Sequence, residues 1–293
     1  MNLFHVMRES FSLLLKKPRI FIPNLFASLL YAFVELIMIK AFIDIIGIMS
    51  GVDPVGIIRG SLTYLPVEEL LPPLLIFGGV ILFFPVIGII DLVTYSMYPA
   101  IVADYHEGRS ISLRRALKDA ISAWRIWLTL GVIFLLFAVF VLTMIGIFAV
   151  LTFLLDNPLC LFIGAVLFIS LIVLFMMAVF FVMPVGVIEK TGVLESFRES
   201  YRLGFRHKGE VIFLNVFVIL VIIVAFALGS IFGTEKLGAG ITFMAIILFL
   251  TVRIIQSLMY TYIYVVNPYF YVGVARMNRL PVGACERNPF SSR

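Results

Sequence analysis

Three long apolar runs of this chain end in a proline, at Pro99, Pro184 and Pro268, and the intervals between these prolines are 85 and 84 residues. A short basic segment and two apolar stretches precede each proline. A period this regular predicts one structural unit used three times. Each proline is expected to stop its helix. Within a single integral membrane domain, we predict repeats over about 1–99, 100–184 and 185–268 and a tail over 269–293.

The composition of the chain is that of a membrane protein. It is 62% hydrophobic and 13% charged, whereas a soluble domain has about 25% charged residues. About 20 consecutive apolar residues cross the hydrocarbon core of a bilayer. We therefore predict an all-α, polytopic membrane protein with six transmembrane helices. They are expected near residues 20–47, 72–98, 126–155, 159–187, 211–233 and 239–266.

The positions of lysine and arginine predict the orientation of these spans. All but four of the 22 lie in the N-terminal segment, in the second and fourth connections or after the last span; the exceptions are Lys40, Arg59, Lys236 and Arg253. Short loops rich in these residues stay in the cytoplasm. We therefore expect a multi-pass protein of the cell membrane with both termini, and the tail, in the cytoplasm. The first apolar run is too long for a signal peptide, so it is expected to be retained.

Three basic segments have the amphipathic pattern of helices. Between residues 112 and 125, apolar residues recur at steps of three and four and basic residues fill the other face, with Ser112 as the expected N-cap. Similar patterns follow Phe4 and Leu194. We predict three helices on the inner leaflet, which either bind lipid or a protein partner or act as struts that set the depth of each hairpin. The side chains expected to contact anionic headgroups are Arg8, Lys16, Lys17, Arg114, Arg115, Lys118, Arg198, Arg202 and Arg206.

The first and third basic segments share short sequence matches. Glu9-Ser10-Phe11 matches Glu195-Ser196-Phe197, and Asn24 lies at a position that matches Asn215. The two asparagines are expected to hydrogen-bond between helices. Because all three repeats run in the same sense, we expect them to be related by an axis near the membrane normal, unlike the inverted repeats of many transporters.

Charged residues within the predicted spans are costly in hydrocarbon and indicate a buried polar site. Glu35 lies about 15 residues into the first span and Arg253 about 15 residues before Pro268, so both are roughly 22 Å from the cytoplasmic boundary at 1.5 Å per residue. We predict that they pair, with Gln256 or Asp91 nearby. The cluster is either a relay for an ion or a headgroup, or a buried pair that fixes helix register.

Signatures of catalysis, metal binding and nucleic-acid binding are absent from the sequence. No GxSxG, HExxH or GxxxxGK[ST] pattern occurs. His5, His106 and His207 are not at metal-ligand spacing with other ligand residues, so no metal and no cofactor is expected. The ionisable run Asp104 to Glu107 is explained by a solvated loop. The basic charges lie beside spans, where attraction to anionic lipids explains them without nucleic acid.

Two runs of the chain resemble a known family. They are Pro99 to Ala116 and Pro184 to Leu203, the second with Ile188-Glu189-Lys190-Thr191-Gly192 and Ser200-Tyr201-Arg202-Leu203. Both look like the cytoplasmic connections of uncharacterised prokaryotic, largely archaeal, six-span membrane proteins related to the membrane domain of glycerophosphoryl diester phosphodiesterases. The resemblance implies a helix bundle with interfacial helices and a lipid connection. It transfers no catalytic residue, because the soluble phosphodiesterase barrel is absent here.

These observations predict a non-enzymatic integral membrane protein. Its expected role is a lipid-associated scaffold, or a membrane partner of another protein, with anionic headgroups on the cytoplasmic face as its lipid partners. The alternative is a permease or a lipid or ion translocator that uses the polar cluster around Glu35 and Arg253.

Overall fold

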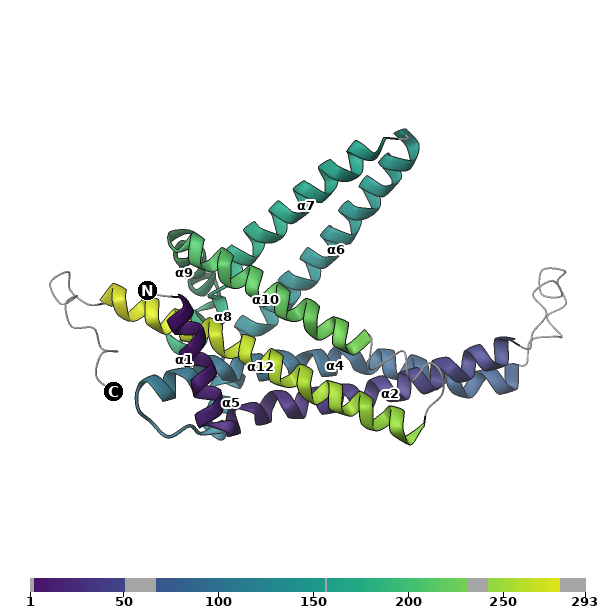
Figure 1. The fold of residues 1–293 in the computed structure, drawn as a ribbon, viewed down its shortest axis with the longest axis horizontal. Helices are drawn as coiled ribbons and strands as arrows, with labels where there is room; N and C mark the ends of the chain where they lie inside the picture. Colours follow the sequence, from purple (N-terminus) through teal and green to yellow (C-terminus); the bar gives the residue numbers. More distant parts are fainter. Residues whose placement is uncertain (1–2, 51–66, 156, 231–241, 280–293) are drawn as a thin grey trace. The chain divides into compact units, whose positions relative to one another are not determined.

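The computed structural model describes residues 3–50, 67–155, 157–230 and 242–279. These residues form helices, with no strand among them, which confirms the all-α class. In chain order (Figure 1) the helices are α1 (Leu3–Lys16), η1 (Pro18–Phe21), α2 (Ile22–Ser50), α4 (Val67–His106), α5 (Leu113–Ser122), α6 (Trp124–Leu155), α7 (Pro158–Val179), α8 (Val182–Ile188), α9 (Val193–Arg206), α10 (Lys208–Gly229) and α12 (Phe243–Arg279).

Five helices of the described chain are long and apolar enough to cross a membrane, judged by length and composition. They are α4, α6, the stretch Phe162–Ile188 of α7 and α8, α10 and α12, and they coincide with five of the six predicted spans. The remaining predicted span corresponds to α2. This helix has 29 residues but is not among the five, and it carries Glu35, Lys40 and Asp44.

The chain divides into two compact units, and the single membrane domain expected from the sequence stays a prediction. The first unit comprises Met1–Ile20, Leu92–Leu220 and Thr261–Arg293, and the second comprises Phe21–Asp91 and Val221–Tyr260. Long helices such as α4 and α12 therefore contribute one part to each unit.

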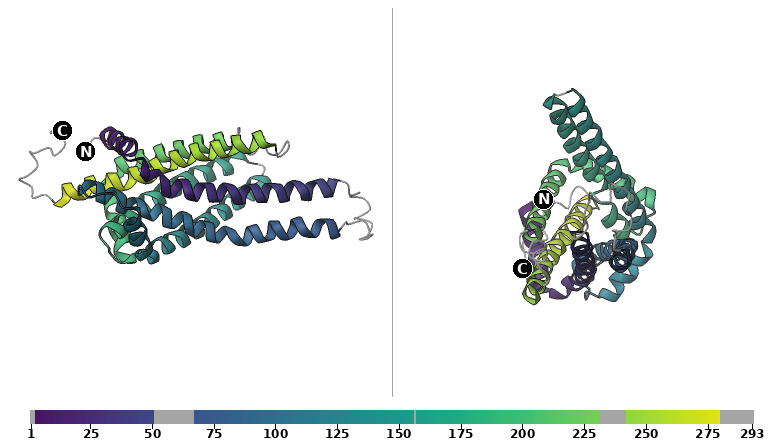
Figure 2. Two further views of the ribbon diagram at one scale, coloured as in Figure 1. Left: turned by 90° about the horizontal axis from the view of Figure 1, so that it is seen from below. Right: turned by 90° about the vertical axis from the view of Figure 1, so that its right-hand side faces the viewer.

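Within the second unit, α2 lies between two other helices. Ala32 packs with Ala245 and Phe249 of α12, and Val34 packs with Val80 and Ile87 of α4. Residues two apart on a helix point roughly 200° apart, so the two contacts use opposite sides of α2. Figure 2 shows α2 and the first part of α4 running side by side.

The three short amphipathic helices of the first unit share one burial pattern. In each, an exposed basic residue precedes a half-buried acidic residue and then a buried small residue, which is the eighth residue of the helix. The residues four before and three after the small residue are also buried. The three triplets are Arg8-Glu9-Ser10 of α1, Lys118-Asp119-Ala120 of α5 and Arg198-Glu199-Ser200 of α9.

This pattern aligns Ser10 with Ser200, one helical turn from the sequence match with Ser196. A shift of four residues nearly preserves the phase of an amphipathic helix. The two registers therefore look alike in the sequence, and the burial of the side chains distinguishes them.

The three prolines do not end their helices, so that prediction is wrong. Pro99 and Pro268 lie inside α4 and α12, and Pro184 lies in the first turn of α8. The predicted tail begins inside the last helix, because Tyr269–Val274 belongs to α12 and is mostly buried. A helix continues past proline where other segments satisfy the backbone groups that the ring leaves without a partner.

Asn267 supplies one such partner. In a continuous helix the amide of residue 184 would donate to the carbonyl of Phe180, but proline has no N–H. The side-chain nitrogen Nδ2 of Asn267 donates to this carbonyl instead, at 2.7 Å in a buried site. Asn267 precedes Pro268, so this contact joins the ends of the second and third predicted repeats.

α9 also contacts the junction between α7 and α8. The hydroxyl of Ser200 donates to the carbonyl of Ala178 at 2.7 Å and accepts from the amide of Phe181 at 3.0 Å, across the break between α7 and α8. One turn later, a Cβ at Gly204 would lie 2.2 Å from the carbonyl oxygen of Met177. α9 therefore approaches the backbone of α7 as closely as a glycine allows.

α6 and α7 form an antiparallel pair within the first unit (Figure 1). The rings of Phe137 and Phe175 stack with their centroids 3.8 Å apart, and Phe148 packs against Gly164. The pair borders an apolar hollow of about 390 Å³. None of the residues in the most apolar stretch of α6 is buried, which is typical of a helix surrounded by lipid.

Candidate functional site

Glu35 of α2 and Arg253 of α12 form an ion pair in the second unit. Their side chains are only 14% and 20% exposed. Arg253 Nη1 also donates to Gln256 Oε1 at 2.9 Å, and Gln256 Nε2 donates to the backbone carbonyl of Ala225 on α10 at 2.6 Å. Three of the four predicted cluster residues thus lie in one series of contacts from α2 through α12 to α10.

Aromatic rings border the guanidinium group of Arg253. Its central carbon lies 5.1 Å from the ring centroid of Phe249 and 5.9 Å from that of Tyr31, within the range of cation–π contacts. Asp91, the fourth predicted residue, has an exposed side chain on α4. It forms no ion pair with any residue in the described part of the chain. The cluster therefore consists of one carboxylate, one guanidinium and one amide whose charges balance, and this arrangement suits a fixed contact between helices.

The two asparagines at matching positions differ in the structure. Asn24 Nδ2 donates to the backbone carbonyl of Ser257 at 2.8 Å, which is the predicted bond between helices. Asn215 is buried, yet its side chain makes no hydrogen bond to a described residue. Asn24 and Asn215 therefore have different surroundings, although their positions match in the sequence.

The nine basic side chains predicted to contact lipid lie on α1, directly after it, on α5 and on α9, and all are exposed. Two of them form ion pairs with other residues of the protein. Arg115 pairs with Asp104 at 2.8 Å, and Arg202 pairs with Glu199 at 2.7 Å. The other seven form no ion pair with any residue that the structure describes, so their charges are available to external anions.

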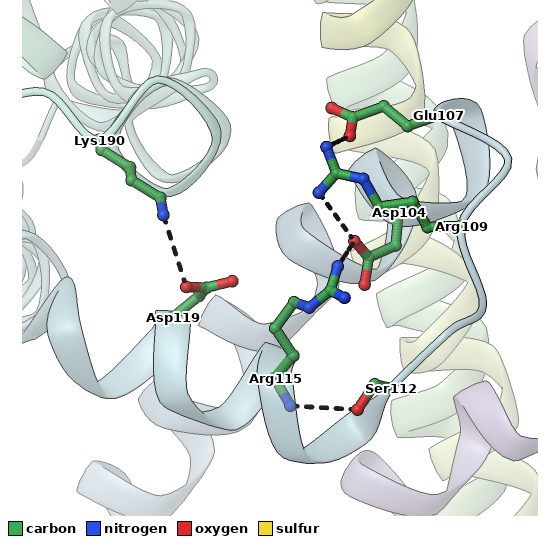
Figure 3. A network of polar contacts seen from close by, with 7 residues as sticks. All are labelled: Asp104, Glu107, Arg109, Ser112, Arg115, Asp119 and Lys190. Carbon is green, nitrogen blue, oxygen red and sulfur yellow. Dashed lines mark hydrogen bonds and ion pairs between the residues drawn. The ribbon is translucent and has the colours of Figure 1, made fainter.

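Asp104 is the centre of a polar network that sequence reasoning missed. The prediction of a solvated loop is wrong for this residue, because it lies in the last turn of α4 and is only 4% exposed. Arg115 Nη1 donates to its Oδ1 at 2.8 Å, and Arg109 lies 3.8 Å from the same oxygen. Arg109 also pairs with Glu107. Figure 3 shows the two arginines reaching this carboxylate, which joins α4 to α5.

A separate ion pair in Figure 3 joins Lys190, in the turn after α8, to Asp119 of α5. The nitrogen and oxygen atoms are 3.8 Å apart. Lys190 has a φ of 54°, a left-handed conformation unusual for a residue with a Cβ. Lys190 and Asp119 both line a hollow of about 390 Å³.

A polar hollow of about 570 Å³ lies between α8, α9 and α12. Tyr271 is 3% exposed, and its hydroxyl donates to Glu189 Oε1 at 3.1 Å. Glu199 is paired with Arg202. Glu195 and Arg206 also line the hollow, and neither forms an ion pair within the described residues. The sequence contained one signal for this site, because Glu189 follows Pro184 by the same five residues that separate Asp104 from Pro99.

The described residues contain no group of three or more His, Cys, Asp or Glu side chains arranged to hold a metal ion. His106 bonds the carbonyl of Val102 through Nδ1 at 3.0 Å, and its ring contacts Tyr269. These contacts anchor the end of α4.

No family model, curated protein or solved structure matches this chain. The resemblance to six-span prokaryotic membrane proteins therefore stays a prediction.

Proposed function

We propose that this chain is a six-span protein of the cell membrane that is held on anionic lipids of the inner leaflet, where it acts as a non-enzymatic scaffold or membrane partner. In this proposal α2 is the first span, and each repeat consists of a short amphipathic helix and a transmembrane hairpin. Six spans place both termini in the cytoplasm. The burial pattern shared by α1, α5 and α9 supports the triplication.

The observation that carries the lipid-binding role is the joint exposure of basic and apolar side chains on the short helices. Arg8 lies within one turn of Phe4 and Phe11, which are 72% and 55% exposed. Arg198 lies in the same way between Leu194 and Tyr201, which are 84% and 55% exposed. Water solvates only the basic groups of such a face, whereas the boundary between headgroups and acyl chains accommodates both.

α5 has the same combination of exposed basic and apolar side chains in a weaker form. Lys118 of α5 is exposed and lies one turn before Ile121, which is 54% exposed. Three equivalent cations near one leaflet would together contribute about 3 kcal/mol, at about 1 kcal/mol for each basic residue near an anionic surface. This amount is large enough to measure and small enough to leave folding intact when it is removed.

The test compares lipids and charge variants. The purified protein in detergent is titrated with phosphatidylglycerol or phosphatidylcholine while its thermal midpoint is recorded. We expect phosphatidylglycerol to raise the midpoint more. The triple variant Arg8→Gln, Lys118→Gln, Arg198→Gln should lose that preference, and the matched variant Arg8→Lys, Lys118→Arg, Arg198→Lys should keep it. Equal responses of the wild type to the two lipids would refute the proposal.

The contacts of Glu35 and Arg253 favour this proposal over the alternative of a permease or translocator. Each charge has its counter-charge, and Gln256 is hydrogen-bonded on both sides. A side chain that binds and releases an ion must be able to exchange its partner in the protein for that ion. The contacts of Glu35, Arg253 and Gln256 instead suit a fixed register between helices.

A further inference from the structure

The break between α7 and α8 has no counterpart in α12, although both precede a proline at the same place in the predicted repeats. α7 ends at Val179 and α8 begins at Val182, two residues before Pro184. α12 continues from Phe243 to Arg279 through Pro268. The proline alone therefore does not decide which helix breaks, and the short helix that packs beside each one has to be compared.

α1 lies against α12 at the level where α9 contacts the break. Ser200 of α9 donates to the carbonyl of Ala178, six residues before the proline of α8. The residue six before the proline of α12 is Tyr262, and its hydroxyl donates to the carbonyl of Met7 in α1 at 3.1 Å. Its ring also contacts Phe11, with the centroids 6.1 Å apart. α1 and α9 thus occupy matching places along the two helices.

The buried serine of each short helix has different bonds. Ser10 of α1 and Ser200 of α9 share a helix position, and both are fully buried. The hydroxyl of Ser200 bonds the backbone on both sides of the break. The hydroxyl of Ser10 makes no hydrogen bond to a described residue. A buried hydroxyl without a bond is unfavourable, so a continuous α12 leaves α1 with a cost that the broken helix removes from α9.

The residue four after each serine explains this difference. In α9 it is Gly204, where a Cβ would lie 2.2 Å from the carbonyl oxygen of Met177. In α1 it is Leu14, which is also buried. A leucine needs more room than a glycine, so it keeps α1 farther from the backbone of its neighbour. The close approach that lets the serine of α9 reach the break is therefore blocked in α1.

α5 agrees with this comparison. Its residue at the serine position is Ala120, which has no hydroxyl. The helix beside it is α4, which it contacts through Arg115 and Asp104, and α4 is continuous through Pro99. Among the three short helices, only the one that combines a serine with a glycine four residues later lies beside a broken helix.

We propose that α12 has a latent break one turn before Pro268, which Leu14 keeps closed and which Ser10 would hold open. In the open form the hydroxyl of Ser10 bonds the carbonyl of Tyr262 and the amide of Val265, as the serine of α9 does at its own break. The proposal rests on the equivalence of the short helices in the proposed triplication, and it goes beyond lipid binding.

α12 is suited to a hinge at this place. Pro268 has no N–H, so the carbonyl of Tyr264 receives no bond from the amide of that residue. The two compact units also divide α12 between Tyr260 and Thr261. A break over the next turn lets the two parts of α12 change their angle, and such a change in a few residues is how a hinge works.

The test is hydrogen exchange of the full chain in detergent, followed over the turn before the proline of α12. The first amides of a helix have no partner in that helix, so a break like that before Val182 would free the amides of Val266 and Asn267. Leu14→Gly should speed their exchange about tenfold or more. Leu13→Gly is the matched control, because Leu13 is equally buried in α1 and its loss leaves a similar cavity. Its effect should be much smaller.

A second comparison tests the hydroxyl. Ser10→Ala added to Leu14→Gly should return the exchange to the level of Leu13→Gly, because the open form loses the group that holds it. Leu14→Ala disturbs α1 less and should show the same change in a smaller amount. If the two leucine variants exchange equally fast, or if Ser10→Ala leaves the fast exchange unchanged, the cavity explains the result and the latent break does not exist. Because this test uses no lipid and no basic residue, it can fail while the lipid-binding proposal stands, and the reverse.

Discussion

The contacts of Arg253 predict unequal effects of removing the two charges of its ion pair. Arg253→Met leaves Glu35, which is 14% exposed, without its only ion-pair partner in the described chain. An unpaired buried charge costs about 3–5 kcal/mol. Glu35→Gln retains an oxygen that accepts from the guanidinium, and Arg253 keeps its contacts with Gln256, Phe249 and Tyr31. This change should therefore cost about 1.5–3 kcal/mol, which is the value of a hydrogen bond to a charged group.

A double variant separates the charge from the packing. Replacing a buried ion pair with apolar side chains of similar size is often neutral or stabilising. Glu35→Leu combined with Arg253→Met should therefore be more stable than Arg253→Met alone. For a chain of this length the midpoint falls by roughly 2 °C per kcal/mol. We expect losses of about 6–10 °C for Arg253→Met and about 3–6 °C for Glu35→Gln.

The assay is thermal unfolding in one detergent, run beside ion flux from liposomes that contain the same preparations. If Glu35→Gln destabilises as much as Arg253→Met, or if the double variant is no more stable than Arg253→Met alone, the ion pair is not the unit that we describe. A wild-type flux that Glu35→Gln abolishes without loss of stability would favour the translocator instead.

Three further substitutions test the packing of the first unit by the same unfolding assay. Gly204→Ala should cost more than 2 kcal/mol because its Cβ would lie 2.2 Å from a carbonyl oxygen of α7, whereas Gly209→Ala meets nothing within 4 Å and should be nearly neutral. Ser200→Ala should cost about 1–3 kcal/mol because a buried amide and a carbonyl lose their partner; a loss below 0.5 kcal/mol would contradict this. Arg115→Ala should cost about 2 kcal/mol and its exposed neighbour Arg114→Ala less than 0.5, and equal losses would show that the buried carboxylate needs no close partner.

The helices and the pairing of Glu35 with Arg253 could be predicted from the sequence because each depends on a simple constraint. Periodicity identifies an amphipathic helix, and apolar length identifies a span. A charge inside an apolar helix needs a counter-charge at similar depth. Asp91 satisfied the same rule of depth but is not part of the cluster, because depth along a helix does not specify which side the residue faces.

The continuation of the helices past their prolines could not be predicted in this way. In a sequence, a proline predicts the end of a helix because its ring removes the backbone N–H donor. Whether the helix continues depends on a partner far along the chain, as Phe180 and Asn267 show. The burial of Asp104 could not be predicted for the same reason. It depends on Arg115 of α5, which contacts Asp104 across the turn between α4 and α5.

The three short helices distinguish positions that packing restricts from positions that it does not restrict. Their small residues, Ser10, Ala120 and Ser200, are all buried and lie at the same helix position. Packing restricts such a position to small side chains in each of the three helices. The third residue of each helix is free of that restriction, and it is His5, Arg115 or Glu195. Because the helix position is shared while the charge changes sign, the reversal at Glu195 is not required by packing. Any binding that differs between the three helices is therefore expected at this third position.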